Sequence, residues 1–167
     1  MCFVLDANAF CCFFDEKNQG HANFIPLFNW LYDRNHSTSL VIGGTLYRQE
    51  IGKLVNYFGY LTELSKVGKI SNIDNSVVDV ETRRISKNIK DKKFNDAHIV
   101  ALICASGCRI LASKDRKADE FIKDKKFYLK DKGQEPPLIY RYKDHKKMLT
   151  KENIVKKLRN LEKSRKK

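Results

Sequence analysis

The sequence predicts an α/β fold with a central, mainly parallel β-sheet and helices on both faces. Short apolar runs typical of buried strands alternate with longer segments whose apolar residues recur at helical spacing. One predicted helix, 97–106, is apolar nearly all round, which indicates burial between layers. The chain has 167 residues, of which 42% are hydrophobic, with 8 Gly and 3 Pro, so it can bury a core without disulfides or a structural metal.

The first part of the chain supplies two predicted strands. Residues 2–5 form an apolar run that ends at Asp6 and predicts a buried strand. The apolar stretch 7–14 fits either a helix or a loop, and 21–33 carries a helical apolar stripe. Residues 39–42 predict the second strand, because a pair of glycines stops the run.

Thr45 is the expected N-cap of the next helix, which carries apolar residues as far as Phe58. Gly59 is expected to divide this helix from another that ends near Gly68. A short strand follows at 70–73. The remaining expected elements are a helix at 77–89 with Val80, Ile85 and Ile89 inward, the helix 97–106 closed by Gly107, a strand at 109–112, a helix at 115–123, and late strands at 127–129 and 138–140.

Charge divides the chain into an expected domain, 1–142, and a basic C-terminal segment, 143–167. The whole chain carries +13, and 143–167 contributes 11 Lys/Arg against 3 Asp/Glu. An amphipathic helix with Thr150 as its N-cap is expected there, because four apolar residues lie at helical spacing: Ile154, Val155, Leu158 and Leu161. Such an excess of positive charge favours a polyanionic partner, nucleic acid first, over a merely soluble lysine-rich surface.

Other features of the sequence argue against membrane and secreted proteins. No apolar run reaches the ~18 residues of a membrane span, and the N-terminus lacks the basic region of a secretory signal. The odd cysteine count fits reduced thiols, so a cytoplasmic protein without membrane association is expected. No cysteine or histidine pair has the spacing of a zinc site, and the expected role of the cysteines is as small buried side chains: Cys2, Cys11, Cys12, Cys104 and Cys108.

Four acids from distant segments are expected at one edge of the sheet. Asp6 ends the first strand, and Asp115 follows the strand 109–112. A crossover helix begins at the edge where parallel strands end, which adds Asp96 at the start of 97–106 and Glu50 in the helix after the second strand. Ligands in open α/β sheets bind at this edge.

Clustered carboxylates repel one another unless a cation neutralises them. Hard oxygen ligands suit Mg²⁺ or Mn²⁺, and such ions can activate a water and clamp a scissile phosphate. Each acid also has an ordinary explanation: Asp96 as a helix-start residue, Asp115 as a turn residue, Glu50 as a solvent-facing residue. Asp6 is hardest to explain this way, because an acid directly after a buried strand needs a partner.

These segments resemble the motifs of PIN-domain nucleases, over roughly residues 1–125. Phe3-Val-Leu-Asp6-Ala-Asn8 is similar to their opening strand, and Tyr47-Arg-Gln-Glu50-Ile to the helix that carries their glutamate. Asn95-Asp96-Ala-His-Ile resembles their apolar helix, and Ile110-Leu-Ala-Ser113-Lys-Asp115 their strand followed by Ser/Thr-x-Asp. The resemblance implies a three-layer sandwich fold and the activity of a metal-dependent endoribonuclease. Many PIN-domain nucleases are toxins of the VapC type.

The resemblance also implies roles for individual residues. Asp6, Glu50, Asp96 and Asp115 would hold Mg²⁺ or Mn²⁺ and carry out catalysis, with Asn8 and Ser113 as polar groups behind them or against the phosphate. Asp119 would be an auxiliary acid at the same edge, although pairing with Lys123 is the simpler expectation. The implied partners are RNA, a cognate antitoxin and a second copy of the chain, in a toxin–antitoxin pair or a related defence nuclease.

Basic residues near the acids and in the C-terminal segment are the expected contacts to nucleic acid: Lys114, Arg116, Lys146, Lys147, Lys156, Lys157 and Arg159. Tyrosines also alternate with bases over 128–143, and stacking on unpaired bases or packing in the core are equally good explanations. His98 is expected to be a satisfied, partly buried side chain. Two alternatives to an enzyme remain: a non-catalytic nucleic-acid-binding module, and a protein-interaction module that uses the basic tail.

Overall fold

A five-stranded, all-parallel sheet forms the centre of the molecule, with strand order β3-β2-β1-β4-β5. The computed structural model describes residues 2–33, 37–89 and 94–150. The predicted α/β class and parallel sheet are confirmed. The strands are β1 (Cys2–Leu5), β2 (Ser39–Gly43), β3 (Ile70–Ile73), β4 (Ile110–Ala112) and β5 (Leu138–Tyr140).

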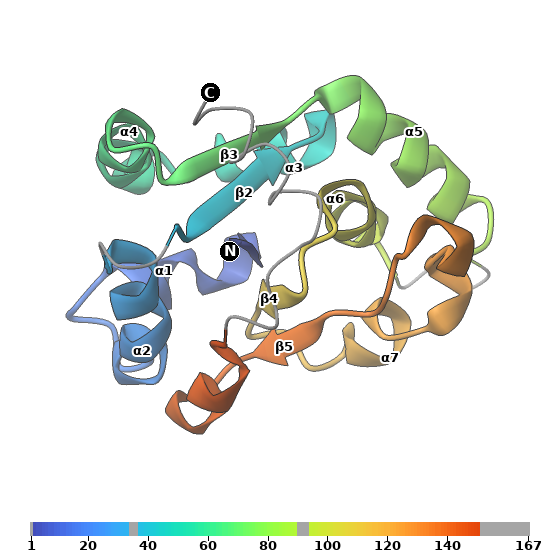
Figure 1. The fold of residues 1–167 in the computed structure, drawn as a ribbon. Coiled ribbons are helices and arrows are strands. Elements are labelled where there is room, and N and C mark those ends of the chain that lie inside the picture. Colours follow the sequence, from blue (N-terminus) through green and yellow to red (C-terminus); the bar gives the residue numbers. More distant parts are fainter. Residues whose placement is uncertain (1, 34–36, 90–93, 151–167) are drawn as a thin grey trace, which may run out of the picture.

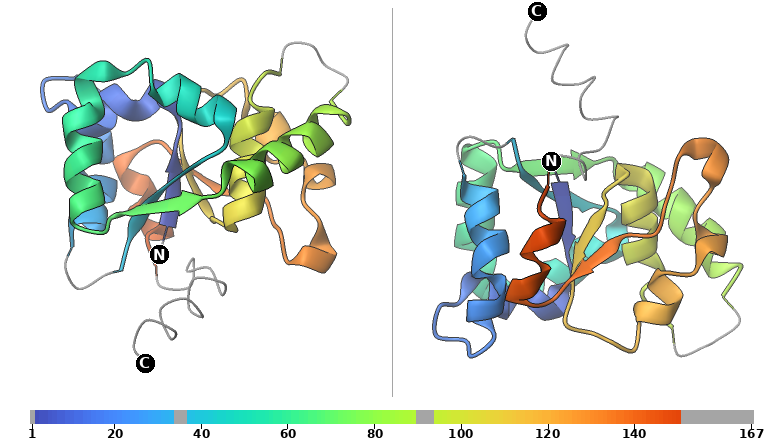
Figure 2. Two further views of the ribbon diagram at one scale, coloured as in Figure 1. Left: turned by 90° about the horizontal axis from the view of Figure 1, so that it is seen from above. Right: turned by 60° about the horizontal axis from the view of Figure 1, so that its bottom comes forward.

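Helices cover both faces of the sheet (Figures 1 and 2). The α-helices are α1 (Phe10–Phe14), α2 (His21–Tyr32), α3 (Thr45–Ile51), α4 (Phe58–Lys66), α5 (Asn75–Ser86), α6 (Ala97–Ser106) and α7 (Asp119–Ile122). Short 3₁₀-helices are η1 (Ala7–Ala9), η2 (Val55–Tyr57), η3 (Lys125–Phe127), η4 (Lys130–Lys132) and η5 (Lys143–Met148). Helix α6 contacts β1, β2 and β3 on one face and packs on α5, whereas α1 and α2 lie on the other.

Helix α6 is buried on nearly all sides, as its sequence predicts. Residues 97–104 are all buried, and the helix ends at Gly107, whose φ of 68° is the left-handed conformation that glycine adopts most easily. The central strands β1 and β4 are equally buried, so the core lies between α6 and the sheet and between the sheet and α1–α2. Four of the five cysteines are buried free thiols in this core, and Cys11 is half-buried.

The glycine that ends α3 was predicted wrongly. Gly52, not Gly59, follows the last residue of α3, and the backbone then leaves helical geometry at Leu54. Gly59 lies inside α4, near its start, where packing on β3 outweighs the low helix propensity of glycine. Thr45 is the first residue of α3, and Gly44 occupies the N-cap.

The inward face of α5 also differs from the prediction. Val78, Glu81 and Ile85 are buried, and Val80 is 55% exposed. The buried stripe contains an acid, Glu81, because its carboxylate pairs with Arg84 and Lys132. An apolar count along the helix could not find a stripe that includes a paired charge.

Two segments after β4 have a secondary structure that differs from the prediction. Residues 115–118 are not helical, because the Asp115 carboxylate accepts a hydrogen bond from the Lys117 amide at 2.7 Å and so holds a local turn. Residues 127–129 do not form a strand: Phe127 ends η3, which the Asp124 side chain caps through the Lys126 amide. Strand β5 therefore pairs directly with β4.

The described part of the basic C-terminal segment packs on the domain. Helix η5 contacts α2 and β5, and Leu149 packs against the core. The amphipathic helix predicted after Thr150 lies outside the described residues. No helix in the described ranges is long and apolar enough to cross a lipid bilayer.

Candidate active site at the carboxyl edge of the sheet

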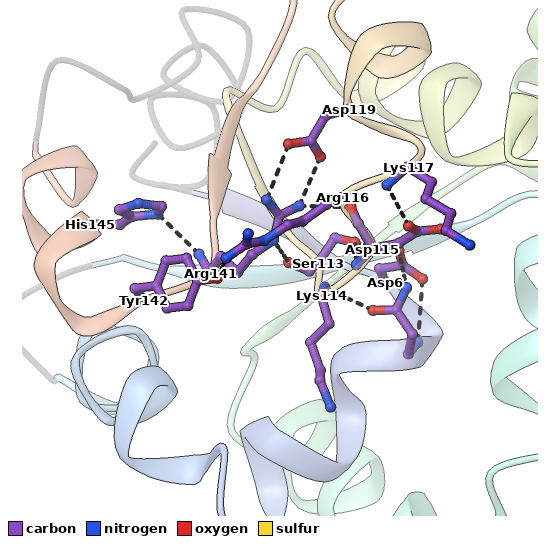
Figure 3. Close-up of polar contacts among 11 residues, drawn as sticks. Asp6, Ser113, Lys114, Asp115, Arg116, Lys117, Asp119, Arg141, Tyr142 and His145 are labelled. Carbon is purple, nitrogen blue, oxygen red and sulfur yellow. Dashed lines mark hydrogen bonds and ion pairs between the residues drawn. The ribbon is translucent and has the colours of Figure 1, made fainter.

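The carboxylate of Asp6 is fixed by groups from two strand ends. Strands β1 and β4 pair in parallel, with Leu5 opposite Ala112, so the next residues, Asp6 and Ser113, come side by side. The Ser113 hydroxyl donates to Asp6 Oδ2 at 2.7 Å, and the Asn8 side-chain amide donates to the same oxygen at 2.8 Å. The Asn8 backbone N–H approaches Asp6 Oδ1 at 3.3 Å. Figure 3 shows Asp6 and Ser113 side by side.

Burial dominates the protonation of Asp6. Desolvation raises the pKa of this carboxyl above its ordinary value, and the nearby charge of Glu50 adds to the rise. The hydrogen bonds from Ser113 and Asn8 act in the opposite direction, because they stabilise the charged form. Asn8 and Ser113 therefore stabilise the charged form of the Asp6 carboxyl and hold it in place.

Asp96 is the most perturbed acid at this edge. It precedes α6, and its pKa is raised to about 6, chiefly by burial. The charge of Asp6 contributes to this rise, His98 opposes it, and Glu50 and Asp115 make smaller contributions to it. The charges of the other three predicted acids thus all act on the Asp96 carboxyl.

Glu50 is held by a histidine that the sequence analysis set aside. The Glu50 carboxylate in α3 lies 2.9 Å from Nε2 of His98 in the first turn of α6. The His98 side chain is 4% exposed and that of Glu50 is 39% exposed, so the pair joins the interior to the open edge. His98 is satisfied and buried, as expected, but its partner is a candidate site residue.

Tyr47 is a second residue that the sequence analysis did not place in the site. Its hydroxyl donates to the Leu5 carbonyl at 2.6 Å, directly before Asp6, and the side chain is fully buried. Burial and the charges of Asp6 and Glu50 raise the pKa of the Tyr47 hydroxyl, which keeps it neutral as a donor. Tyr47 thus ties the helix that carries Glu50 to the strand that carries Asp6.

The loop after β4 is connected to the same network. The Asp115 amide donates to the Ser113 hydroxyl at 3.1 Å, and the Lys114 amide donates to Asn8 Oδ1 at 3.0 Å. Asn8 therefore links the Asp6 carboxylate to the backbone of the loop that carries Asp115. These contacts join the first and fourth of the resembling motifs.

Asp119 pairs with Arg141, not with Lys123. Its two carboxylate oxygens accept from Arg141 Nη1 at 3.1 Å and Nη2 at 2.8 Å. A carboxylate occupied on both oxygens by one guanidinium is a poor auxiliary ligand for a cation. The expectation that Asp119 forms an ion pair is confirmed, but its partner is Arg141 and not Lys123.

The basic residues predicted to bind nucleic acid differ in how accessible their side chains are. Lys114, Lys146 and Lys147 are exposed. The Arg116 guanidinium bonds to the Tyr142 hydroxyl and lies 5.6 Å from the centre of that ring. Tyr128 and Tyr140 are buried, so of the three tyrosines only Tyr142 is accessible to a base. Three further predicted contacts, Lys156, Lys157 and Arg159, lie outside the described residues.

The acids have the donor chemistry of a hard divalent cation but do not enclose one. Carboxylate oxygens are what Mg²⁺ and Mn²⁺ prefer, and a bound cation would offset both the burial and the repulsion from nearby acids that raise the pKa of Asp96. In residues 2–33, 37–89 and 94–150, no group of three or more His, Cys, Asp or Glu side chains is arranged to hold a metal ion. The four carboxylates therefore do not form a closed ligand set.

Comparisons with known proteins add nothing to this site: no protein-family model, curated protein or solved structure matches the chain significantly.

Proposed function

We propose that this chain is a metal-dependent endoribonuclease of the PIN-domain type. The observation that carries the proposal is that hydrogen bonds join the four segments that carry the acids: Ser113 to Asp6, Tyr47 to Leu5 and His98 to Glu50. Burial and the charges of the other three acids also raise the pKa of Asp96 to about 6. Like charges gathered from four separate segments raise the free energy of the folded protein unless they serve a bound cation. The sequence resemblance names the same four acids.

The proposed roles follow from the contacts of each residue. Asp6, Glu50, Asp96 and Asp115 would hold Mg²⁺ or Mn²⁺, which lowers the pKa of a bound water and neutralises charge on the scissile phosphate. Ser113 and Asn8 orient Asp6 through their hydrogen bonds, and His98 orients Glu50.

Positive charge beside the acids fits a phosphodiester substrate. Lys114 and Lys117 are exposed on the loop that carries Asp115. The chain as a whole carries +13, which favours association with a polyanion over long range. RNA is the proposed substrate because the resembling family cleaves RNA; the toxin of a toxin–antitoxin pair, or a related defence nuclease, is the proposed biological class.

A metal-titrated cleavage assay tests the proposal. End-labelled single-stranded RNA and DNA are incubated with the wild-type protein in Mn²⁺, in Mg²⁺ and in EDTA, beside Asp6→Asn and the exposed control Asp131→Asn. We expect cleavage of RNA only with metal, its loss in Asp6→Asn and its retention in Asp131→Asn. RNA binding in a gel shift without cleavage in any metal would contradict the proposal and favour the non-catalytic binding module.

A further inference from the structure

Arg141 is almost fully used by one loop of the protein. It directly follows β5, and its side chain is 10% exposed. Its Nε donates to the Ser113 carbonyl at 2.9 Å, and Nη2 donates to the Asp115 carbonyl at 2.7 Å. Both terminal nitrogens also donate to the Asp119 carboxylate. Four of the five guanidinium N–H groups are therefore directed at residues 113–119 (Figure 3).

These hydrogen bonds hold three residues of the segment that runs from the end of β4 to the first residue of α7. Ser113 is held at the start of the loop, Asp115 in the middle and Asp119 at the end. The planar fork of arginine suits this geometry, because its donors point in fixed, divergent directions. The backbone of Arg141 is also held, since its N–H donates to His145 Nδ1 at 3.1 Å.

The contacts argue against a direct role of Arg141 in binding a polyanion. Both terminal nitrogens of its guanidinium bond to the Asp119 carboxylate. Because the two charges largely cancel, the pair adds little net positive potential to the surface. The exposed cations nearby, Lys114 and Lys117, are much more accessible to phosphate. The guanidinium contacts the backbone carbonyl of Asp115 and that of Ser113, whose hydroxyl bonds to Asp6.

We infer that Arg141 is a positioning residue for the candidate active site, which holds the loop 113–119 so that the Ser113 hydroxyl keeps its place beside Asp6 and the Asp115 carboxylate keeps its place in the turn that it forms with Lys117. The inference rests on the proposed nuclease function for its kinetic consequence only. The placement of the loop is a property of the folded chain and is measured separately. Arg141 touches neither substrate nor metal in this account.

Replacing Arg141 with lysine separates the effect of the positive charge from the effect of the planar guanidinium with its several donors. Arg141→Lys keeps the positive charge, but one ammonium cannot span the two carbonyls and the carboxylate. We expect Arg141→Lys and Arg141→Ala to lower kcat on RNA by about tenfold or more, because small displacements of catalytic groups are costly, while KM changes less than about threefold. The matched controls Arg83→Lys and Arg83→Ala, at an exposed position of α5, should match the wild type.

Amide hydrogen exchange measured by NMR gives a readout that does not depend on cleavage. The Asp115 amide donates to the Ser113 hydroxyl and the Lys117 amide donates to the Asp115 carboxylate, so both report on the loop. We expect both amides to exchange at least about tenfold faster in Arg141→Lys and Arg141→Ala, and unchanged in the Arg83 variants. Asp119→Asn, which keeps both carbonyl contacts, should give a smaller increase, and it remains informative if Arg141→Ala does not fold.

The kinetic and exchange measurements distinguish a failure of the proposed nuclease function from a failure of the positioning role of Arg141. A wild type without nuclease activity, but with faster exchange in Arg141→Lys, would defeat the proposed function and leave the positioning role standing. Wild-type exchange in Arg141→Lys would overturn the positioning role. So would wild-type kcat in Arg141→Lys together with a raised KM in Arg141→Ala, because that pattern is that of a cation which binds RNA.

Discussion

The hydroxyl of Ser113 donates a hydrogen bond of 2.7 Å to the carboxylate of Asp6, 107 residues earlier in the chain. The contact exists because β1 and β4 are parallel neighbours that end at the same level. It joins the first and the last of the four motifs on which the functional argument depends. The same hydroxyl accepts from the Asp115 amide, so one small side chain connects two candidate site acids.

Ser113→Ala should destabilise the protein in a pH-dependent way. The change removes a hydrogen bond to a buried carboxylate, which costs about 1–3 kcal/mol at pH 7. The pKa of Asp6 is already raised by burial, and without Ser113 it should rise further. A raised acid pKa contributes stability that is lost as pH rises through the folded-state value. The deficit in urea unfolding should therefore be larger at pH 7.5 than at pH 4.5, and Ser65→Ala, exposed in α4, should show no such dependence.

Asp96→Asn should stabilise the metal-free protein above pH 6. The folded-state pKa of Asp96 is about 6, above its unfolded value, so the wild type loses stability as pH rises between these values. Two pKa units correspond to roughly 2.7 kcal/mol, and partial exposure reduces the expected gain to about 1–2 kcal/mol. Little else is lost, because the Asp96 side chain makes no capping hydrogen bond to α6.

Urea unfolding in EDTA at pH 4.5 and 7.5 measures the Asp96 effect. The variant should exceed the wild type at pH 7.5 and match it at pH 4.5, and saturating Mn²⁺ should reduce or reverse the advantage. Asp131→Asn, an exposed acid, is the control. A variant less stable than the wild type at pH 7.5 would mean that the Asp96 carboxylate has a structural role.

Two glycines should respond in opposite ways to alanine. Gly44 has φ 84° and ψ 141°, and an added Cβ would lie 2.5 Å from Val78 Cγ1, so Gly44→Ala should cost about 2 kcal/mol or more. Gly59 lies inside α4 with no heavy atom within 4 Å of an added Cβ, so Gly59→Ala should stabilise by about 0.5–1 kcal/mol. Thermal unfolding of the two variants checks the pair. Destabilisation by Gly59→Ala would contradict the helix that the structure assigns there.

Truncation after Thr150 should weaken RNA binding without unfolding the domain. The removed residues, 151–167, carry eight Lys/Arg and two Asp/Glu, whereas η5 and Leu149 remain packed. Each lost phosphate contact should flatten the slope of log K against log salt by about 0.7 for a single strand. Binding titrations from low to high salt measure the slope, and a full-length Lys156→Gln, Lys157→Gln, Arg159→Gln variant separates charge from length. An unchanged slope would show that the segment binds something other than nucleic acid.

Local patterns in the sequence predicted all five observed strands, together with one at 127–129 that does not form, and they directed attention to four acids. Asp6 and Asp115 follow apolar runs, and the rule that ligands bind at the carboxyl edge of a parallel sheet placed them together with Glu50 and Asp96. Helix α6 and its C-terminal Gly107 were predictable for the same reason: every signal lies within a few residues.

Contacts between distant segments were not predictable. The bond from His98 to Glu50 depends on how α3 packs on α6, which no local spacing reveals. Arg141 lies 22 to 28 residues after the groups it holds, among tyrosines that favoured a stacking surface instead. The turn at Asp115 replaced an expected helix because a side chain captured a backbone amide two residues on.

If the four acids form a metal site, the protein binds a divalent cation through them, and Mn²⁺ binding measures this directly. Free Mn²⁺ is followed by electron paramagnetic resonance while wild type, Asp6→Asn, Asp115→Asn and the exposed control Glu120→Gln are titrated. We predict one or two Mn²⁺ bound by the wild type and by Glu120→Gln at sub-millimolar affinity, with at least about tenfold weaker binding when a ligand is changed. Equal Mn²⁺ binding by all four proteins, or no binding by the wild type, would contradict the account.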